Sequence, residues 1–275
     1  MDPAPPPPVA PSPAAPSLLG ASAPAVPQHP IVLVHGLLGF VRRTVTRLLS
    51  FAYFQGVEAH LTGAGVAVKA VALPPSASVD ARARALADAV GGLGAERVNV
   101  VAHSMGGLDA RWWVGRLGGD RRVASLTTIA TPHRGTYVAD WGGTRVGRAL
   151  AGWRLLRDLG VDAGAFADLT RSACEERNAA LEGAPGVPTF SYAGARPWWA
   201  IAAPLQVSFR LLQRTEGPND GLVSVASARF GEFLGTVEAD HFAETGWHWT
   251  LPGVARFDHR AFYLTIARDL ARRGF

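Results

Sequence analysis

The chain has 275 residues, of which 48% are hydrophobic and 18% charged. This balance is typical of a compact domain with a sizeable core and excludes a disordered chain. The net charge is +5, but Lys69 is the only lysine and the arginines are scattered along the sequence, so we expect no nucleic-acid partner. The longest uncharged stretch, residues 197–209, contains two prolines and is too short to be a transmembrane segment.

The first 29 residues are dominated by proline, alanine and serine. We expect them to be a disordered tail or linker, and residues 30–275 to be the folded domain. The segment lacks the basic start and unbroken apolar run of a signal peptide. A linker behind an upstream signal and a misassigned start codon both remain open. Cys174 is the only cysteine, so no intrachain disulfide is expected, and it is predicted to be a small buried hydrophobe.

Short apolar runs alternate with helical patterns along the rest of the chain. Strands are predicted at 31–34, 66–72, 98–103, 123–130, 187–194 and 233–237, and helices at 42–61, 79–93, 108–117 and 257–273. In the helix at 79–93, Leu86 and Val90 are expected to face inward and Arg82 outward. Residues 196–212 show no decisive pattern. The alternation predicts an α/β fold with a mostly parallel central sheet flanked by helices.

Between 138 and 181 apolar residues recur at helical spacing and no strand pattern occurs. An ordinary surface helix would explain this pattern. A helical lid or cap, covering about 136–185, is the alternative that the position between two strands favours.

A strand, a tight turn and a helix meet around Ser104. The apolar run from Val98 leads into Ala102-His103-Ser104-Met105-Gly106, and a helical pattern follows at once. Small residues flank the serine, as a nucleophile elbow requires, because strand and helix backbones cross closely there. A strand–loop–helix with a capping serine would give a similar pattern, so the elbow depends on finding its partners.

A serine hydroxyl needs a base, usually a histidine that a carboxylate orients. Asp220 and His241 each follow a predicted strand, in the order serine, acid, histidine. Five of the other histidines fit less well. Two precede or adjoin the serine (His35 and His103), one precedes any candidate acid (His133), and two lie in a tryptophan-rich loop or beside the last helix (His248 and His259). Asp240 adjoins the histidine and is expected to point elsewhere.

The glycine-rich loop His35-Gly36-Leu37 directly follows the first strand. It is interpreted as an oxyanion loop rather than a simple β-turn. The backbone N–H groups of Leu37 and Met105 are then the expected oxyanion donors.

With these residues located, the chain resembles the bacterial triacylglycerol lipases of the α/β-hydrolase superfamily, of the Pseudomonas and Burkholderia type. The resemblance runs from about Pro30 to the C-terminus. It rests on five segments in order: HPIVLVHGLLGF, VNVVAHSMGGLDAR, TTIATPHRGT, PNDGLV and DHF. It implies the α/β-hydrolase fold with a lid, and catalysis by Ser104, Asp220 and His241 with Leu37 and Met105 as oxyanion donors. It also implies a secreted or periplasmic enzyme, which the N-terminus does not support, so a cytoplasmic location stays open as the alternative.

The chain departs from this group in several ways, among them Ala102 in place of the group's usual glycine. The resemblance implies a calcium site with an aspartate two residues after the catalytic histidine. In this chain Ala243 occupies that place, beside Glu244. Because calcium needs several oxygen ligands, we expect neither calcium nor another cofactor. Many members also contain a disulfide, which a single cysteine does not allow.

The expected function is therefore a serine lipase acting on acyl glycerols or similar apolar carboxylic esters. A peripheral contact with a lipid surface is expected with it. Two alternatives stay open. One is a short-chain carboxylesterase or acyl-thioesterase, and the other is a catalytically silent binding protein of the same fold.

Overall fold

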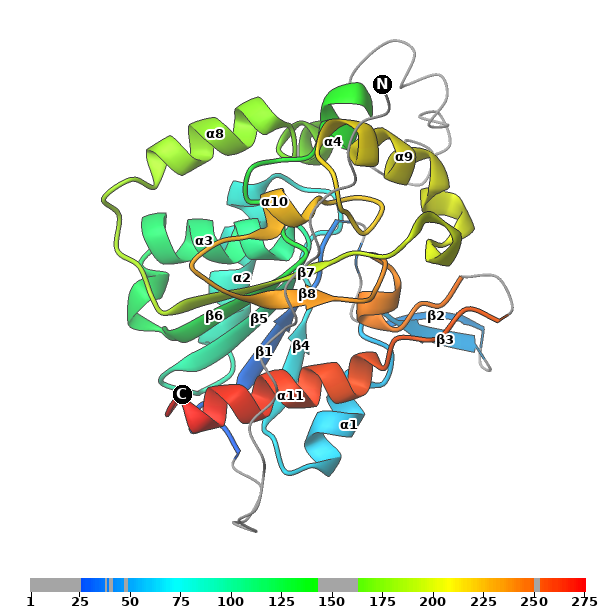
Figure 1. Ribbon diagram of the computed structural model, residues 1–275. Coiled ribbons are helices and arrows are strands. Elements are labelled where there is room, and N and C mark those ends of the chain that lie inside the picture. The colour runs from blue at the N-terminus through cyan, green and yellow to red at the C-terminus, as the bar shows by residue number, and fades with distance from the viewer. Residues whose placement is uncertain (1–25, 38, 40–41, 47–48, 143–162, 250–252) are drawn as a thin grey trace, which may run out of the picture.

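The computed structural model describes residues 26–37, 39, 42–46, 49–142, 163–249 and 253–275. Its central sheet has six parallel strands in the order β4-β1-β5-β6-β7-β8 (Figure 1). They are β1 (Ile31–Val34), β4 (Val68–Val71), β5 (Val98–His103), β6 (Val123–Ile129), β7 (Thr189–Gly194) and β8 (Glu232–Val237). All six lie within or close to predicted strands. The parallel sheet flanked by helices confirms the predicted fold class.

Helices cover both faces of the sheet because its strands alternate their side chains between two cores. In β1, Ile31 and Leu33 join one hydrophobic cluster and Val32 and Val34 join the other. The first cluster packs against α1 (Val57–Gly63) and α11 (His259–Arg272), and the second against α2 (Val79–Gly91) and α3 (Gly106–Arg116).

Two sequence-based expectations are wrong in the first half. The region 42–61, predicted as helix, begins with an antiparallel pair, β2 (Arg42–Thr46) and β3 (Leu49–Ala52), before α1 starts. The β-branched run at 44–46 favours extended backbone over helix. Arg82, expected on the outer face of α2, is fully buried. A buried arginine is unusual unless it is paired, and its partners belong to the site described below.

The segment without a decisive pattern is folded into short helices. It forms η2 (Trp198–Ala200), η3 (Ala203–Leu205) and α9 (Gln206–Thr215). The remaining short helices are η1 (Gly119–Arg121), α10 (Val225–Ala228) and η4 (Ala243–Thr245). Within the described residues, every helix is too short or too polar to cross a bilayer.

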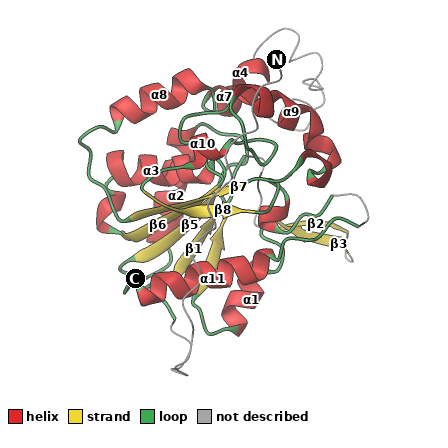
Figure 2. Cartoon of the chain, viewed as in Figure 1, coloured by secondary structure: helices red, strands yellow, loops and turns green. Residues whose placement is uncertain are grey.

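The predicted lid falls partly on residues 143–162, which lie outside the described residues. Its described flanks are α4 (Tyr137–Gly142), α7 (Ala163–Ala167) and α8 (Arg171–Ala180). Figure 2 shows α4, α8 and α9 together at the top of the molecule, opposite α1 and α11. Ala139, Leu169 and Cys174 from these flanks pack against Met105 and Leu108 at the start of α3. The flanks therefore cover the turn that contains Ser104. Cys174 is buried, as predicted.

Candidate active site

Ser104 occupies the tip of the turn between β5 and α3. Its φ is 57°, in the left-handed region that few residues other than glycine adopt. A Cβ at Gly106 would lie 2.8 Å from the carbonyl oxygen of Val34, and one at Gly107 would overlap Thr131. The backbone is fixed by Ser104 N–H donating to Ile129 O and by the Thr131 hydroxyl donating to Ser104 O. The predicted strand–turn–helix is present, and its close approaches explain the small residues after the serine.

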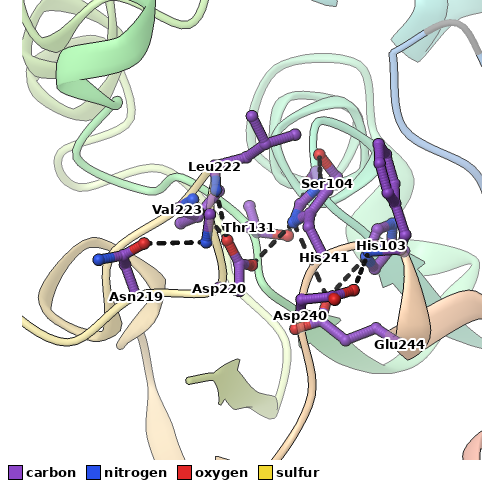
Figure 3. Close-up of polar contacts among 12 residues, drawn as sticks. His103, Ser104, Thr131, Asn219, Asp220, Leu222, Val223, Asp240, His241 and Glu244 are labelled. Carbon is purple, nitrogen blue, oxygen red and sulfur yellow. Dashed lines mark hydrogen bonds and ion pairs between the residues drawn. The ribbon is translucent and has the colours of Figure 1, made fainter. Parts of the chain in front are cut away.

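Asp220 is held in a loop before α10 that leaves its carboxylate surrounded by donors. Oδ1 accepts the N–H groups of Leu222 and Val223 at 2.8 and 2.7 Å, and Oδ2 lies 2.8 Å from His241 Nδ1 (Figure 3). The side chain is completely buried. Three hydrogen bonds to one carboxylate stabilise its charged form away from water.

His241 joins the acid to the serine. The backbone N–H of His241 donates to the backbone carbonyl of Asp220, and the ring atom Nε2 lies 3.0 Å from Ser104 Oγ. Because Asp220 accepts a hydrogen bond from Nδ1–H, the ring keeps its proton on Nδ1 and presents the lone pair of Nε2 to the Ser104 hydroxyl. The structure thus brings together the three residues predicted from the sequence, and the serine and histidine are less than 10% exposed.

A second buried carboxyl, which the sequence did not indicate, lies on the other side of the base. Glu244 Oε2 is 2.8 Å from His103 Nε2 and 3.9 Å from His241 Nδ1. Burial, and then the charges of Asp220 and Asp240, raise the pKa of Glu244 well above its usual range. Burial also lowers the pKa of His103 well below its usual range. We therefore assign a neutral carboxyl that donates its proton to Nε2 of a neutral His103.

This chain of polar groups continues to the candidate oxyanion loop. With Nε2 accepting from Glu244, His103 Nδ1 carries the proton and donates to the Tyr53 hydroxyl at 2.8 Å. The Tyr53 hydroxyl also bonds to the backbone of Gly36. A Cβ at Gly36 would lie only 2.7 Å from Ser104 Cβ. The glycine therefore lets the loop approach the serine, and Leu37 follows it in a turn, partly buried against Met105 and its neighbours.

The buried Arg82 braces the same loop from behind. It donates to His35 O at 2.6 Å, to Pro74 O at 2.8 Å and to Asp109 Oδ2 at 2.8 Å. Burial lowers the pKa of His35 to about 4, so His35 is a neutral ring that hydrogen-bonds to Gly36 O and to Leu73 N–H. An arginine at a helix position surrounded by alanines gives no sequence signal for this role.

The other candidates from the sequence lie elsewhere. His133 contacts Thr128 and Arg111, and His259 bonds to Gln55 O. Asp240 points away from the base, as expected, and its Oδ2 accepts the N–H of Ala202.

The residues around the base do not fit a calcium ion. Asp240 uses both oxygens on backbone N–H groups, those of Phe242 and Ala243 on Oδ1 and that of Ala202 on Oδ2. Within the described residues, the one cluster of three potential metal ligands is His103, His241 and Glu244, in which imidazoles outnumber carboxylates. Calcium prefers six to eight oxygen ligands. That the protein needs no calcium remains a prediction.

Comparison with known proteins agrees with the fold. A model of the α/β-hydrolase fold family matches residues 29–145. Triacylglycerol lipase 2 of Saccharomyces cerevisiae is 30% identical over 314 residues, covering 90% of this chain and 93% of that protein. A triacylglycerol lipase of Vibrio cholerae is 29% identical over 243 residues, covering 75% of this chain and 76% of that one.

Solved structures extend the likeness of fold. The mature Bacillus licheniformis lipase has a TM-score of 0.66 at 24% identity, over 82% of this chain and 89% of its own. The Staphylococcus hyicus lipase has a TM-score of 0.68 at 20% identity, over 92% and 98%. The long match to the yeast protein, together with the fold, identifies this chain as a member of the lipases of the α/β-hydrolase superfamily, which are serine-dependent carboxylic ester hydrolases.

Proposed function

We propose that Ser104 is the nucleophile, His241 the base and Asp220 the orienting acid of a lipase that cleaves acyl glycerols or similar apolar esters. One observation carries this assignment. Ser104 Oγ, His241 and Asp220 form a continuous hydrogen-bonded path, 3.0 and 2.8 Å long at its two steps, on a strained turn.

In the first half of the reaction, Ser104 Oγ attacks the ester carbonyl carbon as its proton moves to His241 Nε2. Asp220 stabilises the resulting imidazolium through Nδ1. The tetrahedral intermediate then collapses, the C–O bond to the alcohol breaks, and the alcohol leaves with the proton from Nε2. Water repeats the sequence on the acyl-serine, releasing the fatty acid and restoring the Ser104 hydroxyl.

The negative oxygen of the tetrahedral intermediate needs donors that are fixed in advance. We assign the N–H groups of Leu37 and Met105 to this role. Met105 is the N-cap of α3, where N–H groups lack partners within the helix. The loop before Leu37 is held by Tyr53 and Arg82, so this donor need not reorganise during the reaction.

Two features support an apolar ester as the substrate. Both relatives described above are named triacylglycerol lipases. The lid is proposed to cover 136–185, and apolar residues from its described parts pack beside Met105, next to the serine. We further propose that the enzyme meets its substrate at a lipid surface, with the lid controlling access to Ser104.

A fluorophosphonate probe tests the nucleophile. Wild-type protein and a Ser172→Ala control, altered at an exposed serine of α8, are expected to be labelled, whereas Ser104→Ala is not. Equal labelling of Ser104→Ala would overturn the assignment.

A series of nitrophenyl esters of increasing acyl length, together with emulsified triglycerides, tests the substrate class. We expect activity to persist on long chains and emulsions and to be unchanged by a chelator. Activity confined to short acyl chains would establish a short-chain esterase instead. Loss of activity on chelation would contradict the prediction about calcium, and turnover of none of these esters would favour a binding protein.

A further inference from the structure

Exposed apolar side chains gather on one part of the surface. Among the described residues, six large hydrophobic side chains are exposed, and three of them lie in the η2–α9 segment: Trp198 (54%), Trp199 (58%) and Val207 (69%). A fourth, Trp249 (52%), packs edge-to-face against Phe242, which packs against the cluster of Ile201 and Leu205 beneath that segment. We call Trp198, Trp199, Val207 and Trp249 the tryptophan patch. Exposed apolar clusters of this kind usually mark a site of interaction.

The η2–α9 segment also carries positive charge and no negative charge of its own, although the exposed Glu238 lies beside Trp199. Phe209 and Leu212 bury one face of α9, while Val207, Arg210 and Arg214 follow one another at helical spacing on the other. The Arg210 guanidinium lies 5.9 Å from the centre of the Trp198 ring. The segment 195–215 contains no aspartate or glutamate, and neither of these two arginines forms a salt bridge with a described residue.

This combination has the chemistry of a membrane-interface contact. Tryptophan rings, with an apolar body and a polar N–H, favour the boundary between lipid headgroups and acyl chains. Arginines beside them bind the phosphates of anionic lipids and contribute about 1 kcal/mol each near such a surface. A second copy of this chain would present the same positive charges, so charge disfavours it as the occupant.

The patch is also tied to the loops that hold the acid and the base. Ala202 N–H donates to Asp240, the residue before His241. A Cβ at Gly221, the residue after Asp220, would lie 2.8 Å from Leu205 Cβ. Asn219 Nδ2 donates to Phe209 O in α9. A lipid surface bound at η2 and α9 would therefore lie directly beside the residues that position the triad.

We propose that the tryptophan patch, with Arg210 and Arg214, is the surface on which this protein docks onto an anionic lipid surface. The proposal rests on the proposed function and identifies where the enzyme meets its lipid, on a segment separate from the lid. The tryptophans supply the apolar contact, and the two arginines supply the preference for anionic headgroups.

Vesicle sedimentation tests the docking in a Ser104→Ala background, in which no lipid is consumed. The vesicles are phosphatidylcholine with and without phosphatidylglycerol. We expect Trp198→Ala/Trp199→Ala to weaken binding to both kinds of vesicle about tenfold or more. We expect Arg210→Gln/Arg214→Gln to weaken binding to the anionic vesicles alone, by about fivefold for each arginine, and to remove its salt dependence.

Two exposed residues remote from the patch supply controls, Arg268→Gln on α11 and Leu93→Ser after α2. These controls should bind like the parent protein. The patch variants in the active protein should also hydrolyse a soluble nitrophenyl ester at the parent rate, which shows that they are folded.

The proposal is overturned if the parent protein does not sediment with vesicles, or if the patch variants bind vesicles as well as the parent does. A concentration-dependent dimer that the tryptophan variant abolishes would also overturn it, in favour of a second copy. Because fluorophosphonate labelling does not involve vesicles, failure of the docking is distinguishable from failure of the proposed function.

Discussion

Two buried carboxyl groups flank the same imidazole, and they are held very differently. Asp220 receives two backbone N–H groups and the N–H of His241, whereas Glu244 meets only His103 and its Oε1 has no partner within the described structure. The first environment stabilises a carboxylate and the second a neutral acid. Both groups are buried, so the differences that favour Asp220 as the group that stabilises the imidazolium are its larger number of donors and its shorter distance to His241 Nδ1, 2.8 Å against 3.9 Å.

Removing the carboxylate of Asp220 should have the largest effect on catalysis. In Asp220→Asn, the N–H groups of Leu222 and Val223 hold the amide oxygen at the Oδ1 position, so the NH2 group faces Nδ1, donates to it and holds His241 in the wrong tautomer. We expect kcat to fall by about 10⁴-fold on a soluble ester. A fall of less than tenfold, in a protein with a native circular dichroism spectrum, would mean that the two carboxyls are interchangeable.

Displacing the second carboxyl should affect stability more than chemistry. A Cβ at Gly194 would overlap Glu244 Oε1 most severely, and would lie 2.9 Å from Ala239 O and 3.1 Å from Asp220 Cβ. We expect Gly194→Ala to lower the free energy of unfolding by about 1–3 kcal/mol, measured in urea. Gly186→Ala is the matched control, because a Cβ there meets nothing within 4 Å. Equal stability of the two variants would show that Glu244 is not confined as described.

The hydrogen-bonded series from Glu244 through His103 ends at Tyr53, and this end can be tested by mutation. In Tyr53→Phe, His103 Nδ1–H loses its partner, which should lower the free energy of unfolding by about 1–2 kcal/mol. Because the same hydroxyl bonds to Gly36, we also expect a modest fall in kcat with an unchanged KM. Tyr192→Phe, in a tyrosine that packs against Phe262 away from the serine, is the control.

The smallest effect at neutral pH is expected for Glu244→Gln, since a neutral amide replaces a neutral acid. The change in the free energy of unfolding should be about 1 kcal/mol or less. Its pH dependence is more informative. The folded pKa is raised, so above about 4.5 the unfolded chain releases a proton that the folded protein keeps.

Rising pH should therefore destabilise the wild type relative to Glu244→Gln. Urea unfolding at about pH 5 and about pH 8 measures this difference. A difference that does not grow with pH would show that Glu244 is ionised in the folded protein.

Much of the site could be predicted because its signals are local. The strand before Ser104, the small residues after it, and the turns around Asp220 are all imposed by backbone geometry within a few residues. Glu244 and Arg82 were missed because their roles depend on distant partners. Glu244 contacts His103, 141 residues away, and Arg82 contacts His35, 47 residues away. The antiparallel pair β2–β3 was missed because its strands pair with each other and not with the main sheet.

The sequence by itself determined the α/β architecture, the elbow at Ser104 and the order of serine, acid and base, because periodicity and turn chemistry are written in neighbouring residues. Only the tertiary structure decided which carboxyl is surrounded by donors, which arginine braces the oxyanion loop, and that Trp198, Trp199 and Trp249 belong to one surface. Burial, hydrogen bonding and exposure depend on what the rest of the chain places around a side chain. No local pattern records them.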